Sequence, residues 1–131
     1  MIKQILPYVF LLFLLTITAN AIEIREADEI IIENNINDSL YAAGGSISID
    51  GDVNGDLTVF GGSISINSPV KESLMSCGGQ VTINAPISKH AHVCGGDVNI
   101  NSAIRGDLTT GGGNININSE IRGTIRAMGG N

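Results

Sequence analysis

The sequence predicts an all-β protein that folds as a single-stranded parallel β-helix, with 17 residues per coil and about five to six coils. Three observations predict this solenoid. Six glycine pairs recur every 17 residues, from Gly44-Gly45 to Gly129-Gly130, and no insertion or deletion disturbs the interval. Between the pairs, apolar and polar residues alternate with the period of two that is typical of β-strands. No repeat has the i, i+3, i+4 pattern of an amphipathic helix.

Residues 1–21 are expected to be a signal peptide. Residues 1–4 form a short, positively charged segment, and residues 5–17 are almost continuously apolar. Ala19-Asn20-Ala21 then has the small-x-small form of a signal-peptidase cleavage site. An uncleaved membrane anchor formed by residues 5–19 is the alternative, although a span needs roughly 20 apolar residues. We therefore expect an exported protein in the periplasm, at the cell envelope or secreted.

Residues 22–37 are expected to form an atypical N-terminal capping coil. Ile30, Ile32 and Ile36 keep the phase of the repeat. The other positions are rich in charge, which discourages a further strand from pairing at that end. These charged residues are Glu23, Arg25, Glu26, Asp28, Glu29 and Glu33.

Residues 38–131 form the β-helix repeat domain, in which Asp38 occupies column 1 of a 17-column coil. Four columns are apolar in nearly every coil, namely columns 3, 10, 12 and 16. Coils of a parallel solenoid stack about 4.8 Å apart, so each column becomes an internal ladder of like residues. Three short strands per coil, of about five or six residues each, are expected between three corners.

Each predicted corner has its own residue types. The glycine pair is expected at the first corner, where a positive φ is needed. The second corner carries Asn67, Asn84, Asn101 and Asn118 in column 13, whose amides can bond to the equivalent residue one coil away. The third corner falls near pairs such as Arg105-Gly106.

Composition limits the function. The formal net charge is -6 and the chain has no Trp. Nucleic acids and anionic membranes are bound by clustered Lys and Arg, so neither is expected as a partner. No nucleophile and base are spaced for catalysis, and no loop interrupts the repeat to shape a pocket. We expect no enzymatic activity and no small-molecule substrate.

The sequence contains one cluster of side chains that are typical ligands of soft metal ions. His90, His92 and Cys94 alternate in one coil, and Cys77 precedes Cys94 by 17 residues. Imidazole and thiolate suit zinc or copper. The same columns hold unrelated residues in other coils, so variation without a metal is the favoured interpretation. The two cysteines are also expected about 4.8 Å apart, within the range of a disulfide in an oxidising compartment.

The repeats resemble those of the bactofilins, a family of bacterial polymer-forming cytoskeletal proteins. The resemblance covers roughly residues 38–131 and rests on coils such as GDLTVFGGSISIN and GDLTTGGGNININ. It implies a right-handed, triangular β-helix that assembles through its ends without a nucleotide, metal or other cofactor. Bactofilins work on the cytoplasmic side, so the export signal indicates an envelope assembly instead.

Self-assembly is therefore the predicted function, with further copies of this chain as the partner. The expected contact residues lie in the last coil: Ile121, Ile125, Ala127, Met128, Gly129 and Gly130. The alternative is an exported binding module that presents a flat polar face to a glycan or another surface. The side chains of that face include Ser46, Ser48, Ser63 and Ser65.

Overall fold

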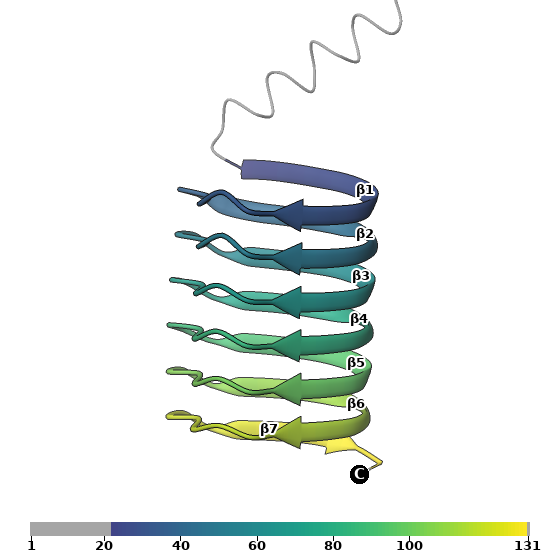
Figure 1. The fold of residues 1–131 in the computed structure, drawn as a ribbon. Helices are drawn as coiled ribbons and strands as arrows, with labels where there is room; N and C mark the ends of the chain where they lie inside the picture. Colours follow the sequence, from purple (N-terminus) through teal and green to yellow (C-terminus); the bar gives the residue numbers. More distant parts are fainter. Residues whose placement is uncertain (1–21, 131) are drawn as a thin grey trace, which may run out of the picture.

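The computed structural model describes residues 22–130, so the predicted signal peptide lies outside the described residues. The described chain is a β-solenoid of about six turns, built from one sheet of seven parallel strands, which confirms the predicted fold class (Figure 1). The strands are β1 (Ile22–Ile32), β2 (Ser39–Ile49), β3 (Leu57–Ile66), β4 (Leu74–Ile83), β5 (Ala91–Ile100), β6 (Leu108–Ile117) and β7 (Ile125–Gly129).

Every strand pairs with the next at the spacing of the glycine repeat. Leu40 lies opposite Leu57 and Ile49 lies opposite Ile66, and the same offset continues through β6 and β7. In Figure 1 each coil runs from left to right behind the axis, returns from right to left in front and descends, which is a right-handed turn. The strict period therefore fixes the pairing register residue by residue.

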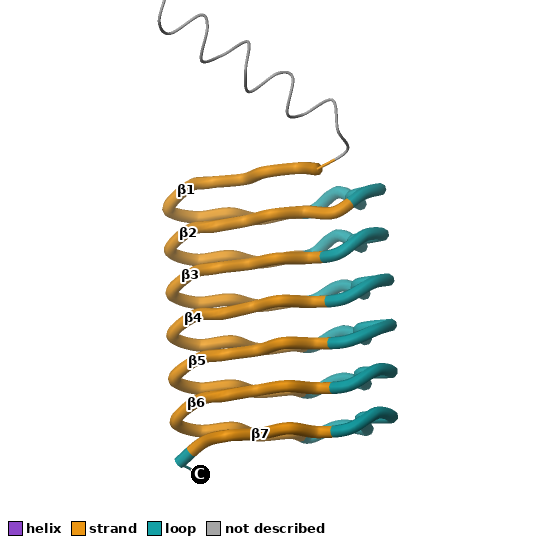
Figure 2. Tube along the Cα trace, turned by 180° about the vertical axis from the view of Figure 1, so that it is seen from behind, coloured by secondary structure: helices purple, strands orange, loops and turns teal. Residues whose placement is uncertain are grey.

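The expectation of three separate strands per coil is wrong. Each complete coil has one strand of 10 or 11 residues that bends through the glycine pair, so one strand forms two sides of the coil. The third side has only an isolated bridge in column 16, such as Val53↔Val70. Figure 2 shows the consequence: the bend is drawn as strand, and loops gather at the opposite edge.

The reason given for the glycine pairs is also wrong. None of the glycines from Gly45 to Gly130 has a positive φ in the left-handed region. A Cβ at Gly78 would instead lie 2.2 Å from the carbonyl oxygen of Gly61, one coil earlier. Gly112 meets Gly95 at the same distance. Glycine is required because the coils approach each other closely at this bend, where there is no room for a side chain.

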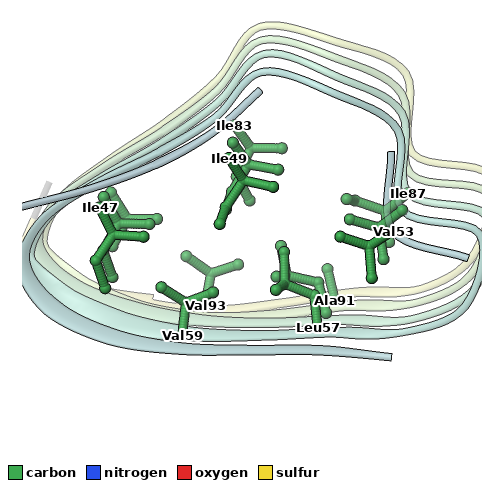
Figure 3. Packing of buried hydrophobic residues seen from close by; sticks show 14 of the residues in the cluster. Ile47, Ile49, Val53, Leu57, Val59, Ile83, Ile87, Ala91 and Val93 are labelled. Atoms are coloured by element: carbon green, nitrogen blue, oxygen red, sulfur yellow. The ribbon is translucent and has the colours of Figure 1, made fainter. Parts of the chain in front are cut away.

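The interior is filled by five ladders of side chains, seen along the axis in Figure 3. From Leu40 to Leu108 the four predicted apolar columns are buried, and Leu57, Ile66 and Val70 are 0% exposed. Column 5 is a fifth ladder, which the sequence analysis missed because Ser76 and Thr110 interrupt its apolar members. Those apolar members are Ala42, Val59 and Val93.

Residues 22–37 belong to the same stack. β1 pairs with β2 along its length, from Ile22↔Ser39 to Ile32↔Ile49. Ile30, Ile32 and Ile36 are buried, as their phase predicts. The charged side chains of Asp28, Glu29 and Glu33 are exposed. The first coil thus has a regular backbone and a highly charged surface.

The predicted asparagine ladder is present on the second corner. Asn67 donates to the carboxylate of Asp50 at 2.8 Å. Asn84, Asn101 and Asn118 then each donate from the side-chain amide to the preceding asparagine at 3.0 Å. The amides of Asn67, Asn84 and Asn101 each donate to the preceding coil and accept from the following one, so the ladder holds neighbouring coils in register.

Candidate assembly interface

The last coil presents apolar side chains that earlier coils bury. Ile125 occupies column 3 and is 47% exposed, whereas Leu108, its neighbour in the preceding coil, is 0% exposed. Ile115, Ile117 and Ile121 pack against the core but are only partly buried. The described chain therefore ends in a surface formed by core columns, which we call the last-coil surface: Ile115, Ile117, Ile121, Ile125 and Ala127.

The structure brings all six predicted assembly residues to this end. The pairing of β6 with β7 runs from Leu108↔Ile125 to Gly112↔Gly129, and Gly130 N donates to Gly113 O at 3.2 Å. Met128, in the outward column 6, is 79% exposed. Every predicted residue from Ile125 to Gly130 is exposed, and Ile121 is half-buried.

Cys77 and Cys94 face each other on adjacent strands. Their Cα atoms are 4.5 Å apart in the register of β4 and β5, and a disulfide joins their sulfur atoms. Column 6 points outward at both positions. The bond therefore ties two neighbouring coils together on the outer face of the sheet, outside the core.

His90 has a structural role at the edge of the solenoid where the loops gather, opposite the glycine bend, which we call the loop edge. Its Nδ1 accepts a hydrogen bond from the backbone N–H of Asp107 at 2.9 Å, so this nitrogen is the unprotonated one. The same column repeats the arrangement with other acceptors. Asp56 N donates to Ser39 Oγ at 3.1 Å, and Thr124 N donates to Asp107 Oδ1 at 2.8 Å. Column 2 is thus a ladder of side-chain acceptors that satisfy the backbone of the following coil.

The acceptor ladder of column 2 was not predicted from the sequence. Its members differ in chemistry but share the ability to accept a hydrogen bond, so no single residue type marks the column. The members are Ser39, Asp56, Ser73, His90 and Asp107. A search for shared acceptor capacity at the repeat interval would have found it.

Three of the four residues of the possible metal cluster have one of these two structural roles. Cys77 and Cys94 are joined to each other, and His90 uses Nδ1 within the chain. His92 lies in the outward column 4 and lines a hollow with His90, Asp107, Thr109 and Arg126. Over residues 22–130 no three His, Cys, Asp or Glu side chains lie close enough together to hold a metal ion.

The outer face of the sheet has two parts. Columns 9 and 11 carry the polar ladder predicted for a binding module, including Ser46, Ser63 and Asp97, which are exposed. Columns 4 and 6 carry three large exposed side chains, and an apolar patch there was not predicted because these columns vary from coil to coil. Tyr41 and Phe60 are each 46% exposed and Met75 is 45% exposed.

One ion pair lies on the loop edge. Lys89 Nζ contacts Glu72 Oε2, and both side chains remain partly exposed. The hydrogen bond to Glu72 and its negative charge raise the pKa of Lys89 above its usual value. Because Lys89 is solvent-exposed, this pair contributes little to stability.

Residues 22–130 include no helix of sufficient length and hydrophobicity to cross a bilayer. No protein-family model, curated protein or solved structure matches the chain.

Proposed function

We propose that this protein is an exported, non-enzymatic structural protein that self-assembles through the ends of its β-solenoid into polymers at the cell envelope. The observation that carries the proposal is the exposure of Ile125. The five earlier described residues of column 3, from Leu40 to Leu108, are at most 1% exposed, and Ile125 is 47% exposed. A coil from a second copy would cover this side chain as the intramolecular coils cover the others.

The energetics require the whole end to take part. Burying one large aliphatic side chain contributes about 1.5–3 kcal/mol. Association costs about 4–15 kcal/mol in lost freedom of motion, so Ile125 alone cannot hold two copies together. The last-coil surface adds Ile115, Ile117, Ile121 and Ala127, and the edge strand β7 adds backbone hydrogen-bonding groups. Assembly should therefore depend strongly on protein concentration.

Two further considerations support the proposal. The repeats resemble those of the bactofilins, which polymerise through solenoid ends. The expected signal peptide at residues 1–21 supports export and an assembly at the envelope. The broad polar ladder of columns 9 and 11 supplies the competing candidate, a binding module in which the ends have no role.

A single substitution in the last coil tests the proposal. Sedimentation velocity and negative-stain electron microscopy of the purified protein, over a range of concentrations, should show rods many solenoids long. Ile125→Lys should abolish or greatly shorten them, because a buried charge at the junction would lack a partner. The matched control is Ser63→Lys on the outer face, which should assemble like the parent.

Two outcomes would contradict end-on assembly. One is a parent protein that stays monomeric at every concentration, and the other is an Ile125→Lys variant that polymerises normally. The intact mass of each preparation should be recorded, because it shows whether residues 1–21 are present. Association through that apolar stretch is then distinguished from association through the solenoid.

A further inference from the structure

Column 4, on the outer face of the sheet, twice places a threonine between larger side chains. Figure 3 shows Leu57 and Val59 pointing into the interior, so Thr58 between them points outward. The pairing register puts each member of the column directly beside the next one. Down the stack, the column holds Tyr41, Thr58, Met75, His92, Thr109 and Arg126. Each threonine therefore has a larger side chain in the coil before it and another in the coil after it.

A hollow lies over each of these two threonines. The first is lined by Thr58 and its column neighbours Tyr41 and Met75, and the second is lined by Thr109 and its column neighbours. His92 lines both hollows, so they follow one another along the solenoid axis. We call this surface the column-4 groove, which comprises the six residues of column 4 together with Asp56 and Asp107.

Both hollows are built on the same short sequence. Gly-Asp-Leu-Thr occurs at residues 55–58 and again at residues 106–109, three coils or about 14 Å farther along the axis. In each case the aspartate of column 2 and the threonine of column 4 point outward on either side of a buried leucine. The groove therefore repeats one combination of a carboxylate and a hydroxyl.

Each of these aspartates has one more oxygen than the acceptor ladder of column 2 needs. Asp56 Oδ1 accepts from the backbone N–H of Ser73 at 3.0 Å, and Asp107 Oδ1 accepts from that of Thr124 at 2.8 Å. Neither Oδ2 atom accepts a hydrogen bond from residues 22–130, although Asp107 Oδ2 lies 3.9 Å from His90 Nδ1. The ladder thus holds each carboxylate in place and leaves its second oxygen available to a ligand.

We propose that the column-4 groove binds a neutral glycan chain that lies parallel to the solenoid axis. The spare carboxylate oxygens would accept hydrogen bonds from sugar hydroxyls, and the threonine hydroxyls can both donate and accept. The ring of Tyr41 and the thioether of Met75 present apolar surface to the C–H face of a pyranose ring. This ligand site is additional to the proposed self-assembly and does not depend on it.

The size of the hollows favours a chain over a single small molecule. Their volumes are about 200 Å³ and 230 Å³, below the range of about 300–1,000 Å³ that is typical of sites for small molecules. One hollow therefore encloses too little of a ligand to hold it firmly. A chain that occupies both hollows gains from the second contact without a further loss of translational freedom.

Charge and backbone pairing favour a neutral glycan over other polymers. Asp56 and Asp107 would repel the phosphates of a nucleic acid or the carboxylates of an acidic polysaccharide, and Arg126 supplies only one positive charge against them. An extended peptide commonly binds a sheet by adding a strand at an open edge. Along this face the backbone groups are already paired between coils, so recognition depends on side chains.

Affinity electrophoresis of the purified protein tests the inference. Native gels that contain hydroxyethylcellulose or glycol chitin, two soluble neutral polymers, should retard the parent, whereas alginate, an acidic polymer, should not. Tyr41→Ala, Asp56→Ser and Asp107→Ser should each raise the dissociation constant at least about fivefold. Serine keeps the acceptor that the ladder requires, as Ser39 and Ser73 do in the same column, and removes only the spare oxygen.

Two matched controls lie on the same sheet outside the groove. Phe60→Ala removes an aromatic ring from column 6 that is as exposed as Tyr41, at 46%. Asp97→Ser removes a carboxylate from column 9 that also accepts a hydrogen bond from the next coil. Neither change should alter retardation. Circular dichroism should show that all variants keep the β-structure of the parent.

Three results would overturn the inference. They are a parent that neither neutral polymer retards, a parent that alginate retards more strongly, and binding that is lost in Asp97→Ser but kept in the groove variants. The last result would place the ligand on the polar ladder of columns 9 and 11. Sedimentation velocity of the same preparations separates this inference from self-assembly. A protein that assembles without retardation overturns the glycan site alone, and a retarded monomer overturns self-assembly alone.

Discussion

Two hydroxyl groups are buried in the core among aliphatic side chains. Ser76 is 0% exposed and Thr110 is 2% exposed, and neither side-chain oxygen has a hydrogen-bond partner in the structure of residues 22–130. Both lie in column 5, where Val59 and Val93 show that an aliphatic side chain fits. A buried hydroxyl without a partner loses its hydration and gains no bond in exchange.

Thr110→Val should therefore stabilise the protein. The substitution keeps the shape of the side chain and replaces an unpaired hydroxyl with a methyl group, so we expect the free energy of unfolding to rise by about 1 kcal/mol. Chemical denaturation at low protein concentration measures this change. Thr109→Val is the matched control, because Thr109 points outward and should change stability little. A Thr110→Val variant less stable than the parent would show that the hydroxyl has a partner.

The disulfide gives a second prediction at the scale of single residues. Unfolding the oxidised protein without a reductant should expose no thiol that reacts with Ellman's reagent, and prior reduction should release both. Because Cys77 and Cys94 are 17 residues apart, opening the bond should lower stability by about 3 kcal/mol. Two reactive thiols in the unreduced protein would contradict the prediction.

At the scale of the strand, the glycine pair lets two sides of the coil form from one continuous element. Gly61, Gly78 and Gly95 follow one another in the sheet, and a Cβ on each would lie within 2.6 Å of the glycine carbonyl one coil earlier. A sequence repeat of glycine is usually interpreted as a break between strands. Here the close approach of the backbones bends the strand while its pairing continues on both sides.

Alanine substitutions distinguish this steric role from a simple turn. Gly78→Ala should destabilise the protein by about 2 kcal/mol or more, because the new Cβ would lie 2.2 Å from a backbone oxygen that cannot move alone. Gly111→Ala is the control, since the nearest atom to its Cβ is 3.7 Å away and Ala43 occupies the same column. Equal losses in the two variants, measured by denaturation, would exclude the steric explanation.

At the scale of the whole molecule, the strict period made most of the fold predictable. The 17-residue interval gives the register directly, so Leu57↔Leu74 and the other ladders follow from the sequence. The number of strands per coil could not be predicted from the sequence, because it depends on whether strand pairing persists through the bend at the glycines. The burial of column 5 could not be predicted either, because two of its residues, Ser76 and Thr110, are polar.

The position of the candidate interface, in the last coil of the solenoid, was predictable from the sequence. The phase of Ile121 and Ile125 assigns them to core columns of the last coil, and their partial exposure in the structure agrees with that position. From the sequence, Glu29 and Glu33 are predicted to protect the first coil from pairing with a further strand.

The uniform offset of 17 between all neighbouring strands makes the length of the solenoid a quantity that can change in fixed steps. Removing or duplicating residues 55–71 would shift the stack by one whole turn, about 4.8 Å, and leave the interior columns continuous. A gene encoding this chain can therefore lengthen or shorten its product by whole turns without redesigning either end. The distance between the two ends is thus free to evolve separately from their chemistry.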